Sequence, residues 1–305
     1  MKYQTASGFR TALEERLRTV AREHGQDALT RQRKLVVFDR LIARLLAVAP
    51  DRWIIKGGLA LDLRLGDRAR TTRDVDIARQ DDEEAATADL LAAQGIDLGD
   101  HFTFSIERTA RLDTATDGAA VRYRAVADVA GRRFDSVIID IGFDDPLLES
   151  PDILLGPTFL TFAGIEPVAV PALPLQQHIA EKVHAYTRTY DRGRASTRVK
   201  DLVDLALIRS AGSFDAGSLR SALDQTFITR ATHPLPPTLP PPPSGWTTPY
   251  RRLATGVGIE PTLRIGYQRS AEWLDPILNR SARDEARWND VRGEWEGPGE
   301  EDRQA

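Results

Sequence analysis

Residues 56–78 read KGGLALDLRLGDRARTTRDVDIA, and this stretch decides which fold the chain adopts. It runs from a glycine pair to two aspartates separated by one residue, with four arginines between them. Gly57 and Gly58 follow the apolar segment WII, which predicts a short strand that turns directly into a helix. The segment RDVDIA predicts a second strand. Because side chains alternate along a strand, Asp74 and Asp76 point to the same face of it.

The two aspartates and the two glycines each have two interpretations. Neighbouring carboxylates repel unless a cation lies between them, and Mg²⁺ suits such a pair because it binds carboxylates together with substrate phosphates. The alternative is the polar face of an edge strand, where each aspartate pairs with Arg68, Arg70 or Arg73. Backbone N–H groups at Gly57 and Gly58 could hold phosphate oxygens, although a tight turn explains both glycines equally well. The chain contains no G-x-x-x-x-G-K-[ST] motif, so this is not a P-loop.

A third acid lies in the segment FDSVIIDIGF, residues 134–143, which is rich in β-branched residues. Alternation places Asp140 on the face opposite Ile139 and Ile141. A carboxylate in so apolar a strand is costly unless it is paired or bound to a metal. A D-x-D strand beside a strand with a further acid is the arrangement used for two-metal phosphoryl and nucleotidyl transfer. The alternative for Asp140 is an acid at a strand end, hydrogen-bonded to a turn.

The composition excludes several classes of protein. The chain has 305 residues and no cysteine, which excludes disulfides, thiol catalysis and thiolate metal sites and fits a cytoplasmic location. There is no apolar run of about 18 residues and no apolar segment of a secretory signal, so we expect no membrane contact. The net charge is −4, with 36 Arg and 5 Lys. The acidic residues are dense near the C-terminal end and the middle of the chain is richer in Arg, so local basic patches for RNA are compatible with this balance.

The chain divides into segments of different character. We expect N-terminal helices in 1–49 that pack on the core, a mixed α/β domain in 50–171 and a helical domain in 172–290. A proline-rich connector spans 233–245, and an acidic tail, 291–305, has the composition of a disordered segment. Strands are also expected at HFTFSIE, AVRYRAVADVAG, FLTFAG and EPVAV, and helices at 174–190, 197–210, 215–229 and 267–279.

The order of these motifs resembles the AbiEii family of nucleotidyltransferase toxins. KGGLALDLRLG, R-x-R-x-T-x-D-V-D-I, IIDIGF, HIAEKVHAY and RVKDLVDLALI follow one another between residues 53 and 210. The mycobacterial MenT toxins are similar, and the family belongs to the DNA polymerase β-like nucleotidyltransferase superfamily. The resemblance implies an α+β fold, with a nucleotidyltransferase-like mixed sheet lobe and a helical C-terminal lobe. It also implies an enzyme that uses Mg²⁺ (or Mn²⁺) and takes an NTP as substrate.

The resemblance also implies roles for individual residues. Asp74, Asp76 and Asp140 correspond to catalytic carboxylates that bind the metal, and Lys182 and Asp204 to catalytic residues of the helical lobe. The implied nucleotide-binding residues are Lys56, Gly57, Gly58, Thr72, Arg198, Lys200 and Asp201. The sequence departs from the superfamily at Gly58 and Leu59, where relatives carry a serine or another small hydroxyl residue that contacts phosphate. The hydroxyl of Thr71 or Thr72 could replace it.

Simpler interpretations compete with these roles. Lys182 could be a solvated helix lysine or pair with Glu181. Lys200 and Asp204 are four residues apart and could form a surface ion pair on one helix. Arg122 and Arg124 alternate on one strand face. They could follow an RNA backbone, or they could be solvated or ion-paired arginines.

The expected function follows from the resemblance. We expect transfer of NMP from NTP to RNA, with the tRNA 3′ end as the acceptor by analogy with the MenT toxins, so that aminoacylation is blocked and growth stops. The toxin would belong to a type IV system with an AbiEi-like antitoxin encoded nearby, which need not bind it directly. The alternatives are nucleotidyl or kinase-like transfer to a small molecule or a protein, and a catalytically silent nucleotide-binding module.

Overall fold

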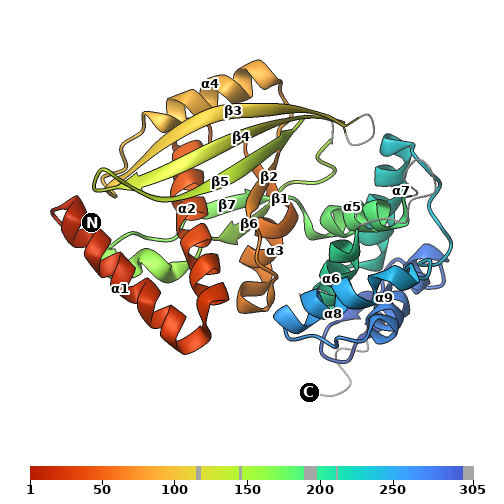
Figure 1. Cartoon of the computed structure of the whole chain (residues 1–305). Coiled ribbons are helices and arrows are strands. Elements are labelled where there is room, and N and C mark those ends of the chain that lie inside the picture. The colour runs from red at the N-terminus through yellow and green to blue at the C-terminus, as the bar shows by residue number, and fades with distance from the viewer. Residues whose placement is uncertain (115–117, 144–145, 189–197, 211, 298–305) are drawn as a thin grey trace. The chain divides into compact units, whose positions relative to one another are not determined.

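A computed structural model describes residues 1–114, 118–143, 146–188, 198–210 and 212–297 (Figure 1). The chain forms two compact units. The sheet unit comprises Met1–Leu63 and Thr71–Leu173, and the helical unit comprises Arg64–Arg70 and Pro174–Ala305. The longer part of the helical unit begins at Pro174. The short segment Arg64–Arg70, by contrast, gave no sign in the sequence that its contacts lie with the helical unit.

The sheet unit is built on a seven-stranded mixed sheet with the order β3-β4-β5-β2-β1-β7-β6. The strands are β1 Ile54–Lys56, β2 Asp74–Ala78, β3 Phe102–Thr114, β4 Gly118–Val129, β5 Arg132–Gly142, β6 Asp152–Leu155 and β7 Ala169–Ala172. β2 runs parallel to β5 on one side and antiparallel to β1 on the other. β2 is therefore an inner strand, and the alternative that placed Asp74 and Asp76 on an edge strand is wrong. The expected α+β class is confirmed.

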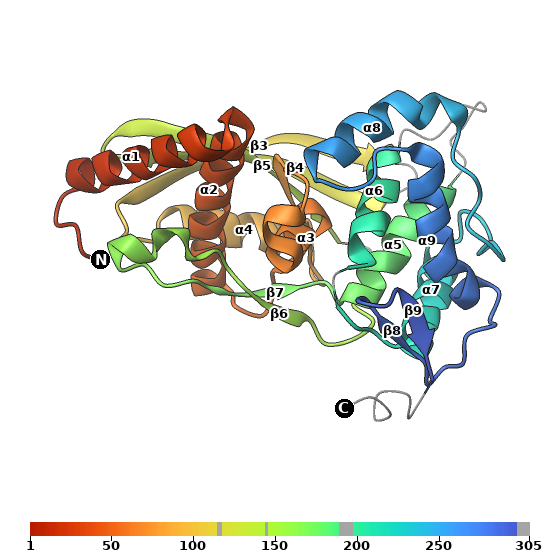
Figure 2. The ribbon, with the colours of Figure 1, turned by 90° about the horizontal axis from the view of Figure 1, so that it is seen from below.

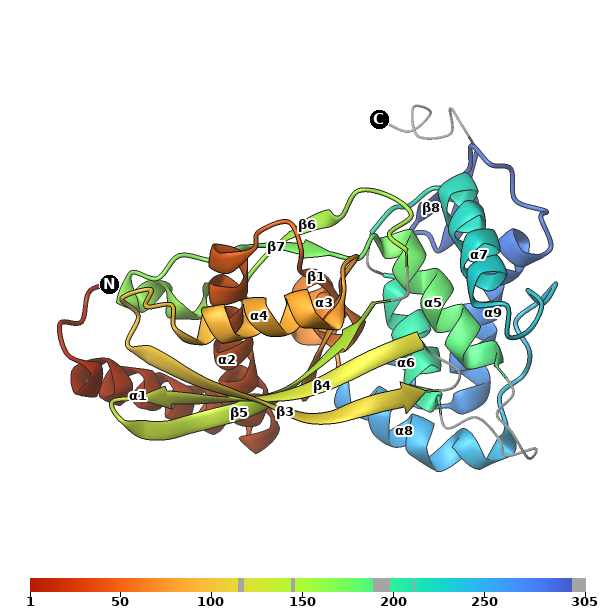
Figure 3. The same ribbon diagram turned by 90° about the horizontal axis from the view of Figure 1, so that it is seen from above.

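Helices pack against this sheet. They are α1 Ala6–His24, α2 Gln26–Val48, α3 Gly57–Leu65 and α4 Glu83–Gln94, with the 3₁₀ turn η2 Thr158–Ala163. The 3₁₀ turn η1, Gly66–Arg68, follows α3 and belongs to the helical unit. α1 packs on α2, α2 packs on α4 and β5, and α4 packs on β3. Figure 3 shows α4 extended along the sheet. Alternate residues of β5 and β2 fill the core below these helices, since Val75, Ile77, Ile139 and Ile141 are fully buried.

The segment FLTFAG is not the strand that its apolar content indicated. It lies in the 3₁₀ turn η2, in which Leu160 and Ala163 are the buried residues. A spacing of three is helical and does not match the alternation of a strand. Gly164 closes the turn in the left-handed conformation, with φ at +72°. The strand at this edge of the sheet is β6 instead, which we did not expect from the sequence.

The helical unit consists of five helices and a C-terminal hairpin within the described residues (Figure 2). They are α5 Leu175–Thr187, α6 Val199–Ile208, α7 Ala216–Arg230, α8 Thr247–Gly256, α9 Leu263–Leu278, β8 Arg287–Asn289 and β9 Glu294–Glu296. α5 packs on α6 and α7, and α6 packs on α8 and α9. The connector 233–245 leads from α7 to the turn η4, Ser244–Trp246, before α8. The hairpin includes part of the segment expected to be a disordered tail, and residues 298–305 lie outside the described residues.

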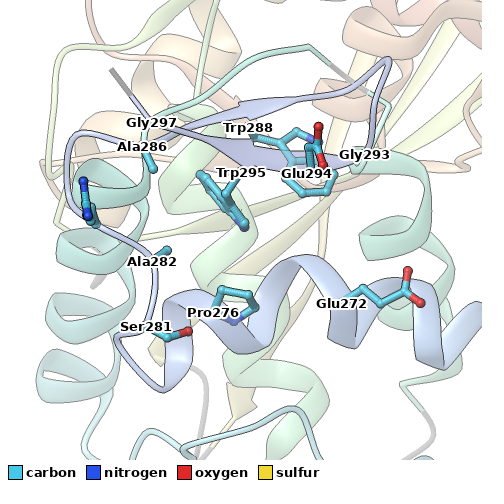
Figure 4. A pocket seen from close by; sticks show the side chains of 11 residues that line it. Glu272, Pro276, Ser281, Ala282, Ala286, Trp288, Gly293, Glu294, Trp295 and Gly297 are labelled. Carbon is cyan, nitrogen blue, oxygen red and sulfur yellow. The ribbon is translucent and has the colours of Figure 1, made fainter. Parts of the chain in front are cut away.

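A cavity of about 540 Å³ lies between α9 and the hairpin β8–β9 (Figure 4). Trp295 points from the hairpin toward α9, where Pro276 lies, and its indole Nε1 donates a hydrogen bond to the backbone oxygen of Trp273 at 2.9 Å. None of the residues that the sequence predicted for the functional site lines this cavity. In the described part of the chain, no helix has the length and apolar character needed to cross a membrane.

Candidate active site

The strand register places four charged residues in one row across the sheet unit. Arg122 of β4 lies opposite Asp140 of β5, Asp140 lies opposite Asp76 of β2, and Asp76 lies opposite Lys56 of β1. The pairs Arg122–Asp140 and Asp76–Lys56 join opposite charges, whereas the pair Asp140–Asp76 joins like charges. Opposite charges on neighbouring strands stabilise a sheet, whereas like charges destabilise it. In this row, Arg122 lies beside Asp140 and Lys56 lies beside Asp76, so each carboxylate has a cation on the strand to its outer side.

Arg122 forms a two-point ion pair with Asp140. Its Nε lies 2.7 Å from Oδ1 and its Nη2 lies 2.7 Å from Oδ2. This hydrogen bond raises the pKa of Arg122, burial opposes the change, and the charges of Asp140, Asp74 and Asp76 add to it. Of the interpretations considered for Arg122, the structure shows the ion-paired one. Both oxygens of the carboxylate that we predicted as a third metal ligand are thus bound by an arginine.

Asp74 is held by the residue two positions before it. The hydroxyl of Thr72 donates to the Asp74 carboxylate Oδ1 at 2.8 Å, and it also lies 3.2 Å from the backbone oxygen of Asp74. Thr72 is buried, whereas Asp74 is half-buried. A buried hydroxyl with this contact fixes the rotamer of the carboxylate. The place of Thr72 in the structure is therefore against Asp74, and its predicted contact with a nucleotide remains a prediction.

Gly57 is the point where the chain passes closest to Asp76. α3 begins at Gly57, directly after β1, and Gly57 has a φ of +62°. A Cβ atom at this position would lie 2.7 Å from Cγ of Asp76 and closer still to one of its carboxylate oxygens. Only glycine accommodates both the backbone conformation and this approach. The first turn of α3 therefore lies beside a carboxylate, an arrangement that the helix dipole favours.

The carboxylates of the sheet unit fit a cation such as Mg²⁺ in part. Asp74 and Asp76 are half-buried on one face, and Mg²⁺ is commonly bound by one or two carboxylates, with waters and substrate phosphates completing its shell. Among the described residues, however, no group of three or more His, Asp or Glu side chains is gathered closely enough to hold a metal ion. The role of Asp140 as a third ligand therefore stays a prediction, because its partner in the structure is Arg122.

The helical unit contains a separate cluster of buried charges. Nζ of Lys182, on α5, donates to Oδ2 of Asp204, on α6, at 2.7 Å and lies 3.6 Å from Oδ1 of Asp201. Nε of Arg70 lies 2.9 Å from Oδ1 of Asp204, and its Nη2 lies 3.1 Å from Oδ2. The exposed fractions are 6% for Lys182, 7% for Asp201 and 0% for Asp204. These four side chains, Arg70, Lys182, Asp201 and Asp204, are called the buried charge cluster below.

The buried charge cluster excludes the simpler interpretations of the helical residues. Lys182 is neither solvated nor paired with Glu181, whose partner is Arg230 at 3.4 Å. Asp204 does not form a surface pair with Lys200, because Asp204 is fully buried and Lys200 is exposed. A charged side chain that is buried without a partner costs much free energy, so Lys182 and Asp204 need the opposite charges that lie beside them.

The charges of the cluster set one another's protonation. Burial would raise the pKa of Asp204, but the charges of Lys182 and Arg70 outweigh it and hold this pKa below its ordinary value. Burial would lower the pKa of Lys182, but Asp204 and Asp201 raise it further than burial lowers it, while Arg70 acts against them. For Asp201, burial dominates and raises the pKa. Lys182 and Asp204 are therefore a charged pair at neutral pH.

A comparison with known families decides the identity of the chain. The family model for "Nucleotidyl transferase AbiEii toxin, Type IV TA system" matches residues 40–278, which include the acidic strand β2 and the buried charge cluster. The chain belongs to this family. It is a nucleotidyltransferase, as the family description states, and its family supplies the toxins of type IV toxin–antitoxin systems. The resemblance that the sequence motifs indicated is confirmed.

A comparison with solved structures found chains that are similar to this one. MenT4, a nucleotidyltransferase toxin from Mycobacterium tuberculosis H37Rv, is similar with a TM-score of 0.58 and 18% identity, over 86% of this chain and 89% of that chain. A putative nucleotidyltransferase from H. pylori has a TM-score of 0.45 and 15% identity, over 82% of this chain and 96% of its own. JHP933 from Helicobacter pylori has a TM-score of 0.45 and 15% identity, over 83% of this chain and 94% of its own. A comparison with curated proteins gave no match.

The AbiEii motifs predicted most of the residues that the structure gathers, but not their partners. Asp76, Asp140 and Lys56 meet in one row, and Lys182, Asp201 and Asp204 meet in one cluster. Arg198 is close enough to lower the pKa of Asp201, although burial dominates there, whereas Lys200 points to solvent.

Sequence reasoning missed the partners of two arginines. We considered Arg70 as a partner for the aspartates of its neighbouring strand, yet it pairs with Asp204, which lies 134 residues away. Arg122 pairs with Asp140 on the next strand. The alternation of Arg122 and Arg124 was a signal for a charged strand face, but no local pattern indicated which carboxylate would lie opposite.

Proposed function

We propose that this enzyme transfers a nucleoside monophosphate from an NTP to a hydroxyl of RNA, with the 3′ end of tRNA as the acceptor. The observation that carries the proposal is the pair Asp74 and Asp76 on one face of an inner strand, where Thr72 orients the Asp74 carboxylate and Gly57 passes directly beside Asp76. Two half-buried carboxylates on one strand face, beside the first turn of a helix, suit Mg²⁺, which binds carboxylates together with substrate phosphates.

In the proposed reaction, the acceptor oxygen attacks the α-phosphorus of the NTP. A new P–O bond forms, the bond from the α-phosphorus to the oxygen bridging to the β-phosphorus breaks, and pyrophosphate leaves. The hydroxyl proton passes to a carboxylate or to water. We assign Asp74 and Asp76, with Asp140 as the third carboxylate, to hold Mg²⁺ or Mn²⁺, which when bound would activate the hydroxyl and offset phosphate charge. For this role, Asp140 would first have to exchange Arg122 for the ion.

Other residues of the chain bind and orient the nucleotide in this proposal. Gly57 and Gly58 present backbone N–H groups at the first turn of α3, next to Lys56. Lys182 supplies a point charge for the phosphates, for which an ammonium on a flexible stem is suited. Arg198, Lys200 and Asp201, at the start of α6, assist it. These assignments are supported by the AbiEii motifs and by the burial of Lys182 against two carboxylates.

The biological outcome in this proposal is an arrest of translation. Nucleotides added to the tRNA 3′ end would block aminoacylation, and growth would stop. The likeness in fold to MenT4, a nucleotidyltransferase toxin, is compatible with such a role. An AbiEi-like antitoxin encoded nearby would counteract the toxin, and direct binding between the two proteins is not required.

The test uses purified protein, total tRNA and each of the four NTPs labelled at the α-phosphate. We expect label in tRNA from at least one NTP, and no label with Asp74→Asn or Lys182→Ala. A parallel reaction with γ-labelled NTP separates nucleotidyl from phosphoryl transfer. Label found only in a protein or a small molecule would replace RNA by that acceptor. Transfer that persists in both variants would show that the assigned site is wrong.

A further inference from the structure

Arg70 makes the most complete contact within the buried charge cluster. It is the only one of the four side chains that touches both oxygens of Asp204, at 2.9 and 3.1 Å. We propose that Arg70 is a positioning residue for nucleotidyl transfer, because it fixes the carboxylate of Asp204 and thereby the ammonium of Lys182. This inference rests on the proposed role of Lys182 in binding the nucleotide phosphates.

The orientation of Asp204 decides where the ammonium of Lys182 lies. Oδ2 of Asp204 accepts from both Nη2 of Arg70 and Nζ of Lys182, whereas Oδ1 accepts from Arg70. The planar guanidinium binds the two oxygens at once, so it prevents rotation of the carboxylate plane. Without Arg70, the carboxylate could turn, and the contact with Lys182 would no longer have one fixed geometry.

Asp201 is the competitor for the same ammonium. Its Oδ1 lies 3.6 Å from Nζ of Lys182, and its Oδ2 is buried with no hydrogen-bond partner in the described part of the chain. A buried oxygen without a donor attracts any mobile donor nearby, because its desolvation is uncompensated. Arg70 keeps Asp204 in place as the closer partner of Lys182. We therefore infer that loss of Arg70 moves Nζ toward Asp201.

The count of charges supports the same conclusion. Two cations, Arg70 and Lys182, face two carboxylates, Asp201 and Asp204. If Arg70 is removed, Lys182 loses the cation that shares the Asp204 carboxylate with it and is held more strongly by Asp204, while Arg198 still acts on Asp201. An ammonium so held is less available to a phosphate, since the phosphate must compete with a carboxylate whose charge Arg70 no longer offsets. Arg70 thus serves the reaction through its neighbours and does not itself need to touch the nucleotide.

The segment that carries Arg70 also offers a matched control. Arg68 lies two residues earlier and donates to Oγ of Ser210 at 3.3 Å and to the backbone oxygen of Ser210 at 3.2 Å. It contacts the residues that follow α6 and does not belong to the buried charge cluster. Arg68→Ala therefore removes an arginine and its contact from the same segment while leaving Arg70, Lys182 and Asp204 intact.

The first experiment measures kcat and KM for transfer to tRNA in a double-mutant cycle. We expect Arg70→Ala to lower kcat/KM by about 100-fold, the effect of misplacing a catalytic group by about 1 Å. We expect Arg68→Ala to change it by less than about threefold, as for an exposed contact. The double variant Arg70→Ala/Asp204→Ala should be no less active than Asp204→Ala alone, because Arg70 acts through Asp204. Losses that multiply would overturn the proposal.

The second experiment does not depend on the reaction. The chain has five lysines, so ¹⁵N labelling of lysine Nζ gives few NMR signals, and Lys182→Arg identifies the one from Lys182. We expect this signal to shift in Arg70→Ala and to stay unchanged in Arg68→Ala. An unchanged Lys182 signal in Arg70→Ala would refute the positioning role. If the wild-type protein transfers no nucleotide, the proposed function fails, and the NMR signal still decides whether Arg70 positions Lys182.

The variant Arg70→Lys covers the case in which Arg70→Ala does not fold. A lysine keeps the charge but cannot bind two oxygens in one plane. We expect its kcat/KM to lie between those of the wild type and Arg70→Ala, with a smaller shift of the Lys182 signal. Wild-type kcat/KM together with an unshifted signal in Arg70→Lys would show that charge alone suffices and that the two-point contact has no positioning role.

Discussion

The carboxylate of Asp76 occupies the space beside Gly57 that any other residue would need for its Cβ atom. Gly57 also has a positive φ, of +62°. The glycine pair that opens the fold-determining stretch and the aspartate pair that closes it are therefore parts of one contact. The requirement for glycine at position 57 comes from the second strand, not from the turn alone.

Gly57→Ala is expected to lower activity far more than its effect on the backbone explains. The matched control is Gly66→Ala, because Gly66 has a similar φ of +58° and a Cβ atom added there would meet no atom within 4 Å. Both variants should lose about 1 kcal/mol of unfolding free energy from the strained backbone. Only Gly57→Ala should also displace Asp76 and abolish tRNA labelling. Equal residual activity of the two variants would contradict a role for the close approach.

Thr72→Val is expected to lower kcat/KM by about tenfold, since the hydroxyl that orients the Asp74 carboxylate is lost and the shape is kept. Thr71→Val is the control, because Thr71 directly precedes Thr72 and its side chain is exposed. Steady-state kinetics with varied NTP give the result. If Thr71→Val is the more damaging change, the hydroxyl that replaces the superfamily serine is that of Thr71, and Thr72 has only a structural role.

The affinity for Mn²⁺, measured by calorimetry, tests Asp140 as a metal ligand. Asp140→Asn should weaken binding, because a carboxylate is lost, and Arg122→Gln should strengthen it, because the competing guanidinium is lost. Arg124→Gln is the control, since Arg124 lies two residues along the same strand and has no ion pair in the described part of the chain. Unchanged affinity in Asp140→Asn would remove Asp140 from the ligand set.

Tyr250 is expected to make the folded protein sensitive to alkaline pH. Burial raises the pKa of Tyr250 to about 12 from an ordinary value of 10.0, and its hydroxyl is buried with no hydrogen-bond partner in the described structure. The folded state therefore keeps a proton that the unfolded state loses. Stability from this group is complete below pH 10 and is lost as the pH rises toward 12. Tyr250→Phe should flatten this part of the stability curve.

Chemical denaturation between pH 8 and about 12 gives this measurement, with the window set by the two pKa values. At pH 8, Tyr250→Phe should be neutral or stabilising by about 1 kcal/mol, because a buried hydroxyl without a partner is removed. Tyr267→Phe is the control, since the Tyr267 hydroxyl donates to the backbone oxygen of Leu239 at 2.9 Å. Its loss should destabilise the protein by about 1 kcal/mol. The reverse order of the two variants would show that Tyr250 has a partner in solution.

The sequence predicted the elements that have a strong period of their own. β2 and β5 alternate as expected, with Val75 and Ile139 buried and Asp76 and Asp140 on the other face. Segments in which the spacing of apolar residues is weakly periodic were assigned wrongly or not at all. The apolar segment FLTFAG forms a 3₁₀ turn, and α8, which contains Pro249, was not among the expected helices. A proline in the first turn of a helix removes no hydrogen bond, which explains why α8 tolerates it.

By itself, then, the sequence determined which residues are charged in apolar surroundings and on which side of a strand they lie, because alternation and burial are local properties. Only the tertiary structure decided their partners. β2 became an inner strand between β5 and β1, which set Asp76 beside Asp140, and Arg70 met Asp204 across 134 residues of chain. Strand order and register depend on contacts between distant segments, and no local pattern specifies which of many similar arginines and carboxylates will come within reach of one another.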